Sequence, residues 1–243
     1  MGDIFPLTGS EVRRSWYYRF KPGEIIPYEA DGEMLKANEI KENVLSNGLL
    51  CCNTTSYSLI HLFSETGRDQ AVRWMLNKGL DIETAAGGST PLHFAASMSR
   101  EAVVQLLLER GANIDAKDGA EYTRLMHAAD YGHTEVVRLL LEKGAEIDLE
   151  TVSGTALNLA ASSGRVEVVR LLLENNAAVD VQNCYGETAL FKAAGYGFDR
   201  VVSLLLEKGA SPDVRNYKGD TVTDAAKIMG RKVVVQLLRE KAK

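Results

Sequence analysis

TPLHFAA, at residues 90–96, decides the interpretation of this chain, because close variants of it return at nearly regular intervals. The variants are TRLMHAA at 123–129, TALNLAA at 155–161 and TALFKAA at 188–194. Their leading threonines lie 33, 32 and 33 residues apart. A period of this size indicates a stack of small repeated units. Such a stack usually presents one long binding surface and is much less often a catalyst.

Each unit is predicted to contain two helices. Thr90 can cap the first helix, and Pro91 fits the first helical position, where no backbone donor is needed. A second helix is predicted over residues 101–110, and its apolar set is wide enough for packing between two neighbours. Gly111 is expected to end that helix in the left-handed conformation. The same stop recurs at Gly79, Gly144, Asn176 and Gly209, and Asn is a common substitute for Gly in that conformation.

This pattern resembles the ankyrin repeat, in which Gly-x-Thr-Pro-Leu-His-x-Ala-Ala and a helical pair are followed by Gly-Ala-x-Ile-Asp. The resemblance implies an all-α ankyrin-repeat solenoid of helix-turn-helix units with hairpin loops, preceded by a non-repeat N-terminal cap. We predict two parts: a non-repeat segment over residues 1–53 and six repeats over residues 54–243. The predicted leading positions are Ser58, Thr90, Thr123, Thr155, Thr188 and Thr221.

A few residues depart from the repeat. Glu121 stands where the turn normally carries glycine, and Met126 replaces the histidine of the Thr-Pro-Leu-His motif. The loops that end at Thr90 and Thr155 are one residue shorter than their neighbours. These departures concern the shape of single turns and leave the predicted fold unchanged.

The N-terminal segment does not follow the period. Val12, Trp16 and Phe20 are spaced by four residues, which predicts one apolar face of a short helix. Residues 25–28 are expected to be extended, and residues 40–49 resemble a degenerate half-repeat. The segment could be a binding or regulatory arm, but we favour a cap that covers the apolar face of the first repeat.

Composition narrows the function. The chain is 45% hydrophobic and 25% charged, with a net charge of -5 and no basic stripe, so nucleic acid is not an expected partner. It has neither an apolar run of 18 residues nor a signal-peptide profile, so no membrane association is expected. Its three cysteines form no disulfide framework or metal spacing, which favours the cytoplasm or nucleus. We predict a monomer without metal or cofactor.

The resemblance also implies a concave face made of the loop tips and the ends of the first helices. Six of the nine tyrosines fall on such positions, where stacking does not require them. Tyrosine gives a large contact area at small entropic cost, which favours binding, although each could instead pack locally on a neighbouring loop. The candidate protein-binding residues are Tyr57, Met98, Tyr122, His127, Asp130, Tyr131, Tyr185, Tyr196 and Tyr217.

Two classes of function remain open. We favour a protein–protein interaction module, acting as adaptor, scaffold or inhibitor, that binds a protein or peptide on the concave face. The alternative is an enzyme, or an accessory subunit of one, that uses the groove together with the N-terminal segment, with His127, Asp130 and Tyr131 placed for proton transfer. The fold offers no deep dry pocket by default, so no catalytic residue is predicted. His61, His93 and His133 occupy the repeat's own histidine positions and are expected to be structural.

Overall fold

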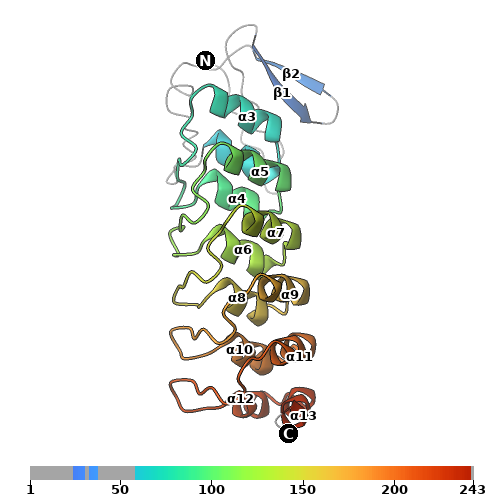
Figure 1. Ribbon diagram of the computed structural model, residues 1–243. Coiled ribbons are helices and arrows are strands. Elements are labelled where there is room, and N and C mark those ends of the chain that lie inside the picture. Colours follow the sequence, from blue (N-terminus) through green and yellow to red (C-terminus); the bar gives the residue numbers. More distant parts are fainter. Residues whose placement is uncertain (1–23, 31–32, 38–57, 242–243) are drawn as a thin grey trace, which may run out of the picture.

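The computed structural model describes residues 24–30, 33–37 and 58–241, in which six pairs of helices stack in one direction (Figure 1). We number these pairs as units 1 to 6. The first helices are α2 (Leu59–Thr66), α4 (Pro91–Ser97), α6 (Arg124–Tyr131), α8 (Ala156–Ser162), α10 (Ala189–Tyr196) and α12 (Val222–Ile228). The second helices are α3 (Asp69–Asn77), α5 (Glu101–Glu109), α7 (Thr134–Glu142), α9 (Val166–Glu174), α11 (Asp199–Glu207) and α13 (Lys232–Lys241). The predicted all-α solenoid is confirmed.

The core runs continuously through the stack. Each first helix packs on the first helices of its neighbours, and the second helices do the same. The alanine pairs of the repeat, such as Ala95 and Ala96, are fully buried, and their small size lets adjacent helices approach closely. Val103, Val104 and Leu107 of α5 are also fully buried, as expected for a helix packed on two sides.

The predicted helix stops are confirmed. The second residue after the end of each of the first five second helices has a positive φ, between 64° and 89°. Glu121, at the position where glycine was expected, has a φ of 66° and so adopts the same left-handed conformation as a glycine. The residues that end the second helices are Gly79, Gly111, Gly144, Asn176 and Gly209.

The loops that join each second helix to the next first helix, which we call fingers, come in two lengths. In the shorter kind, Ala86 and Ser89 exchange backbone hydrogen bonds of 2.8 and 3.0 Å around a two-residue tip. In the longer kind, Oδ1 of Asn183 accepts the amide N–H groups of Tyr185 and Glu187 at 2.9 and 3.0 Å. Thr151 and Gly154 close the other short finger, and Asp118 and Asn216 close the other long fingers.

Two neighbouring fingers touch through their backbones. A Cβ atom added to Gly88 would lie 2.6 Å from the backbone nitrogen of Gly119, whereas one added to Gly87 would meet nothing within 4 Å. Both Gly87 and Gly88 have positive φ, 59° and 84°, so alanine would strain the backbone at either position. Only Gly88→Ala would also push the two fingers apart.

We therefore expect Gly88→Ala to destabilise the protein by about 3 kcal/mol and Gly87→Ala by about 1 kcal/mol. Urea unfolding of the two variants beside the parent chain measures the difference. Equal losses in the two variants would show that the finger contact contributes nothing and that only the backbone strain matters.

A β-hairpin lies at the N-terminal end of the stack, with β1 (Glu24–Ala30) antiparallel to β2 (Glu33–Ala37). The extended conformation predicted for residues 25–28 is confirmed within β1, while β2 was not foreseen. In Figure 1 the hairpin stands beside α3, and β1 contacts that helix. The predicted helix around Trp16 and the half-repeat at 40–49 lie outside the described residues, and the role of the segment as a cap stays a prediction, as does its boundary at residue 53.

Unit 6 has polar side chains where interior units are apolar. Lys227 takes the place of the fully buried Ala96, and its side chain is 54% exposed. A polar outer face is what the terminal unit of a solenoid requires. Within the described ranges, no helix is long and apolar enough to cross a membrane.

Candidate functional site

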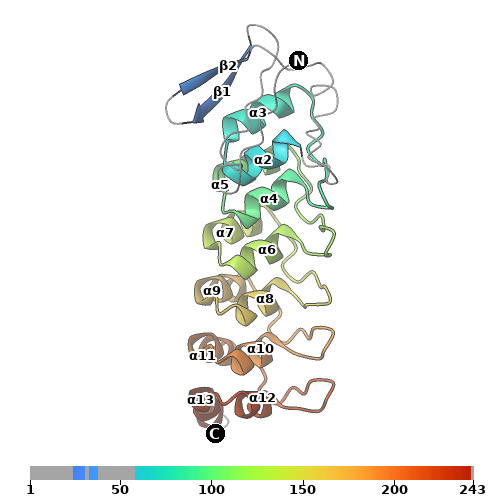
Figure 2. The same ribbon diagram turned by 180° about the vertical axis from the view of Figure 1, so that it is seen from behind.

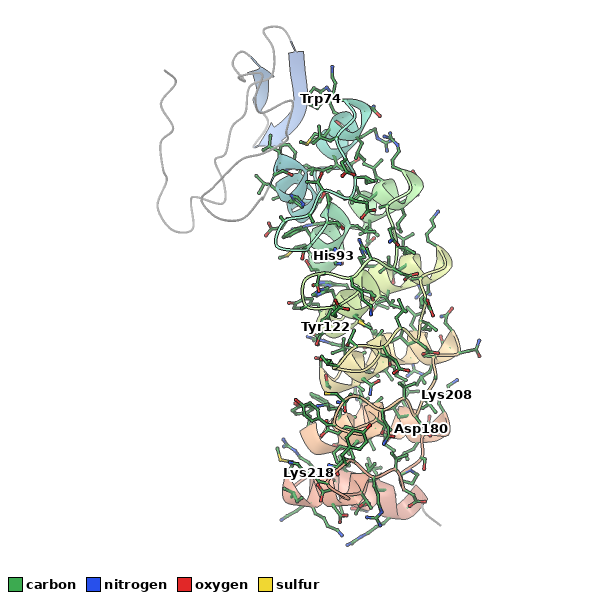
Figure 3. The ribbon with its side chains drawn as sticks, turned by 90° about the vertical axis from the view of Figure 1, so that its left-hand side faces the viewer. Trp74, His93, Tyr122, Asp180, Lys208 and Lys218 are labelled. Atoms are coloured by element: carbon green, nitrogen blue, oxygen red, sulfur yellow. The ribbon has the colours of Figure 1, made fainter. Side chains whose placement is uncertain are left out.

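The first helices and the fingers together form one face of the stack, which we call the groove face. Figure 2 shows the first helices between the fingers and the second helices, and in Figure 3 Tyr122 and Lys218 lie on the first-helix side while Lys208 lies on the other. Among residues 58–240, eight of the nine exposed large hydrophobic side chains belong to the groove face, and the ninth, Val233, is on α13. The eight are Met98, Tyr131, Val152, Tyr185, Tyr196, Tyr217, Ile228 and Met229.

Unit 3 contributes an acid–histidine pair to this face. Nε2 of His127 lies 2.6 Å from Oδ2 of Asp118. Oδ1 of the same carboxylate accepts the amide N–H groups of Ala120 and Tyr122. Burial acts to raise the pKa of Asp118, but the hydrogen bonds from His127 and the two amides outweigh it and lower that pKa. Asp118 is therefore a carboxylate that fixes the orientation of the His127 ring.

Three rings of unit 3 are stacked in a row. Tyr131 lies between His127, whose ring centroid is 6.4 Å away, and His133, whose centroid is 5.9 Å away. Nε2 of His133 donates to the carbonyl of Ser97 in the preceding unit at 2.7 Å, so the expected structural role of His133 is confirmed. The Tyr131 side chain is 53% exposed. It therefore presents a fixed aromatic surface to solvent.

The predicted trio of His127, Asp130 and Tyr131 is only partly brought together. The Asp130 carboxylate accepts a hydrogen bond from the Ser163 hydroxyl at 2.5 Å, and the acid that contacts His127 is Asp118. Asp118 was not among the predicted residues, although its place at the start of a long finger, shared with Asn183 and Asn216, could have marked it. The pairing with Asp118 therefore gives the His127 ring an orientation.

Tyr122 differs from the other candidate tyrosines. Its hydroxyl donates to Oγ of Ser153 in the next finger at 2.6 Å, and its ring packs against the core. Local packing, the alternative considered for each tyrosine, therefore describes this residue. Its ring also lies 5.5 Å from that of His127 and so helps to enclose it.

Units 5 and 6 enclose a hollow of about 490 Å³, which we call the tyrosine hollow. Tyr185, Tyr196 and Tyr217, three predicted residues from two fingers and the end of α10, line it together. On the same wall, Nζ of Lys192 lies 2.8 Å from Oε2 of Glu187. The remaining lining residues are Cys184, Phe191, Gly195, Asn216, Lys218, Asp220, Ala225, Ile228 and Met229.

The charged residues of the hollow were not predicted, but the repeat register places them. Lys192 occupies the position that His127 has in unit 3. Glu187 and Asp220 both directly precede a leading threonine, as Tyr122 does. Positions that vary between units while facing the groove are thus the signal that could have identified them.

The other candidates lie apart from these two clusters. Met98 follows α4 and is 43% exposed on the groove face of unit 2. Tyr57 lies outside the described residues. For all nine candidate residues, a role in binding stays a prediction.

One residue that sequence reasoning missed is Arg124, which stands where TPLHFAA has proline. Its side chain is fully buried between units 2 and 3. The guanidinium donates to the carbonyl of Ala116 and, at 2.8 Å, to Oγ1 of Thr90. Burial lowers its pKa to about 10, which leaves it charged at neutral pH. A charged residue at a position that should carry proline was the available signal.

The described residues contain no group of three or more His, Cys, Asp or Glu side chains placed to hold a metal ion.

Comparison with known proteins finds one matching family and several relatives that each match part of the chain. The family described as "Ankyrin repeats (3 copies)" matches residues 34–118, 119–183 and 157–243. Diacylglycerol kinase iota of Rattus norvegicus is 32% identical over 106 residues, which are 41% of this chain and 10% of that protein. Rabankyrin-5 of Mus musculus is 34% identical over 85 residues, 30% of this chain and 7% of that protein. A putative ankyrin repeat protein of Rickettsia bellii (strain RML369-C) is 43% identical over 61 residues, 25% of each chain.

Proposed function

This chain belongs to the ankyrin-repeat family, whose repeats are generally protein–protein interaction modules, and we propose that it is a recognition module that holds a protein or peptide partner on its groove face. The observation that carries this proposal is the distribution of exposed apolar side chains. Eight of nine in residues 58–240 lie on the groove face. Aromatic side chains gathered on one surface are typical of binding sites.

The groove face suits binding more than catalysis. Tyr131 is held flat between two histidine rings, and Tyr185, Tyr196 and Tyr217 border one hollow. Rigid aromatic side chains lose little conformational entropy when a partner covers them. His127, which has a carboxylate partner in Asp118, has no serine, cysteine or lysine side chain among its hydrogen-bond partners in the described residues. An adaptor, scaffold or inhibitor needs only such a surface.

The relatives do not identify the partner of this chain. The chain spans a tenth or less of the diacylglycerol kinase and Rabankyrin-5 sequences that it matches, so the activity in a relative's name is not transferred to this chain. Fold alone does not imply function. We propose action as a monomer in the cytoplasm or nucleus, because the cysteine usage fits a reducing compartment.

The test replaces Tyr131 and Tyr196 together by alanine. Both side chains are half exposed, so we expect the free energy of unfolding to change by less than about 1 kcal/mol. We expect recovery of bound partners in affinity capture to fall at least roughly tenfold, since exposed tyrosines act as hot spots.

The control replaces Arg138 and Arg170, exposed on the second helices, by alanine. It should leave recovery of partners unchanged. Loss of partners with the control variant, combined with full recovery by the tyrosine variant, would move the binding surface to the opposite face and refute the proposal.

A further inference from the structure

The tyrosine hollow is built from aromatic faces that remain open to solvent. Tyr185, Tyr196 and Tyr217 are 64%, 50% and 74% exposed. The backbone N–H of Tyr217 donates to the carbonyl of Tyr185 at 3.0 Å, so the two fingers that present these rings are held together. Its volume of about 490 Å³ falls within the range of ligand pockets, about 300 to 1,000 Å³.

Two units pair a finger carboxylate with a cationic or titratable side chain at the same helix position, and unit 6 does not. In unit 3 the finger carboxylate of Asp118 meets His127, and in unit 5 Glu187 meets Lys192 at the same helix position. In unit 6 that helix position is Ala225, so the carboxylate of Asp220 has no cation within 4 Å among the described residues.

Asp220 is nevertheless held in place at the edge of the hollow. Its backbone N–H donates to Oδ1 of Asn216 at 2.9 Å, and its Oδ2 accepts from Nδ2 of Asn216 at 3.2 Å. The side chain is half-buried and lines the hollow together with Tyr217. Lys218, at the tip of the same finger, is exposed and forms no ion pair with Asp220.

We propose that the tyrosine hollow binds the side chain of an arginine carried by an extended segment of the partner. This proposal rests on the proposed function and specifies the partner chemistry. A guanidinium stacks on tyrosine faces and also donates to a carboxylate, so it can use the rings and Asp220 at once. The net charge of -5 attracts basic segments over longer distances.

Other side chains fit the hollow less well. An apolar side chain that covered Asp220 would leave a desolvated carboxylate without a cation to balance its charge. An acidic side chain would face Asp220, and the ammonium of Lys192 is already occupied by Glu187, which leaves such a ligand only the exposed ammonium of Lys218 at the finger tip. The cationic partner that Asp220 lacks is therefore the group that a ligand supplies.

Four fluorescein-labelled, terminally blocked peptides test the proposal on the full chain. The first reads Ser-Gly-Arg-Ala-Arg-Gly-Ser, and in the others citrulline, leucine or glutamate replaces both arginines. Citrulline keeps the shape of arginine without its charge. By fluorescence anisotropy, we expect the arginine peptide to bind at least roughly tenfold more tightly than the citrulline peptide. Equal or tighter binding of the citrulline, leucine or glutamate peptide would overturn the proposal.

Matched variants of the chain test whether the arginine peptide binds in the tyrosine hollow. Asp220→Asn should weaken the arginine peptide about fivefold and leave the citrulline peptide unchanged, and Tyr217→Leu should weaken the arginine peptide as well. Asp213→Asn makes the same charge change at an exposed acid outside the hollow and should have no effect. Equal effects of Asp213→Asn and Asp220→Asn would reduce the result to net charge and overturn the proposal.

Cys184 provides a reporter of position, because it is exposed and lines the hollow. The arginine peptide should slow its alkylation, measured by mass spectrometry of the Cys184 peptide, and unprotected alkylation at saturating peptide would place binding elsewhere. If no peptide binds while partner capture still depends on Tyr131 and Tyr196, the arginine proposal fails and the proposed function stands. If the arginine peptide binds but partner capture does not depend on Tyr131 and Tyr196, the arginine proposal stands and the proposed function fails.

Discussion

Replacing Arg124 by alanine is expected to lower the free energy of unfolding by about 3 kcal/mol, although the residue lies outside the predicted binding surface. The side chain is fully buried at the boundary of units 2 and 3. It donates to the Ala116 carbonyl and to Oγ1 of Thr90, and Oε2 of Glu83 lies 3.9 Å from Nη2. Alanine would leave a cavity and remove the donor from two acceptors. Chemical denaturation in urea measures the loss.

Two further substitutions show how much of this loss of stability comes from the burial of Arg124 and how much from the residue that replaces it. Arg138→Ala removes a half-exposed arginine on α7 and should cost less than about 0.5 kcal/mol. Arg124→Pro restores the proline of TPLHFAA at the first helical position, where its ring is tolerated. Both substitutions remove the guanidinium and its hydrogen bonds, but proline fills more of the cavity and its fixed φ suits the first helical position, so we expect Arg124→Pro to be at least about 1 kcal/mol more stable than Arg124→Ala. Equal stability of Arg124→Ala and the parent chain would show that the buried arginine contributes nothing.

The effect of Arg124 on its surroundings is visible at His93. In unit 1, Nε2 of His61 lies 2.8 Å from the carbonyl of Thr84. In unit 2 the corresponding carbonyl, that of Ala116, is taken by Arg124, and the buried Nε2 of His93 has no hydrogen-bond partner. The Nδ1 atom of His93 accepts the backbone N–H of Thr90 at 3.0 Å, so the neutral ring carries its proton on the unpaired Nε2.

The fold was predictable because the backbone itself demands the repeated residues. A left-handed stop needs Gly or Asn, and close helix packing needs alanine, so Gly111 or Ala95 can be interpreted without knowing the neighbouring unit. Arg124 and Asp118 could not be interpreted in this way. Their partners lie in another unit or nine residues away, and only the packed structure determines which carbonyl or ring a long side chain reaches.

The same limit applies to the candidate site. The repeat register placed Tyr185, Tyr196 and Tyr217 on one face, and the structure brings them around one hollow. The register alone could not show that Tyr122 packs inward onto Ser153, because Tyr122 and Glu187 occupy the same register position. The repeat register predicts on which face of the stack a side chain lies, whereas the neighbouring finger determines which residues it contacts.

Acidification is expected to destabilise the protein through His93. Burial, reinforced by the nearby charge of Arg124, lowers the pKa of His93 to about 3, with Asp118 opposing and His127 adding to the decrease. In the unfolded chain its pKa is about 6.5. Between these values the unfolded state binds the proton and the folded state does not, so stability falls as pH decreases from 6.5 towards 3. The full loss is about 5 kcal/mol, reached below pH 3, and the effect vanishes about one pH unit above 6.5.

The chain itself supplies a substitute that does not titrate. Asn158 occupies the same position in unit 4, where its Oδ1 accepts the N–H of Thr155 at 3.1 Å and its Nδ2 donates to the carbonyl of Val181 at 3.1 Å. We expect urea unfolding between pH 6.5 and 4.5 to show a loss of about 2 kcal/mol in the parent chain that His93→Asn removes. Carboxylates that protonate towards pH 4.5 affect both proteins alike, so the difference between the two proteins reports on His93. An identical pH dependence of the two proteins would contradict the assignment to His93.

Combining the two substitutions tests whether Arg124 and His93 are coupled. His61 is the corresponding histidine of unit 1, where burial lowers the pKa and the backbone hydrogen bonds of Thr84 and Ser58 act in the opposite direction. Arg124→Pro would remove a positive charge beside His93, and losing this charge raises the pKa of His93. The substitution would also leave the Ala116 carbonyl available to Nε2 of His93. The acid-induced loss between pH 6.5 and 4.5 should then become smaller in Arg124→Pro than in the parent chain. In His93→Asn the same substitution should leave the pH dependence unchanged, because the titrating group is gone. A pH dependence that Arg124→Pro alters equally in both backgrounds would show that the arginine acts through another group.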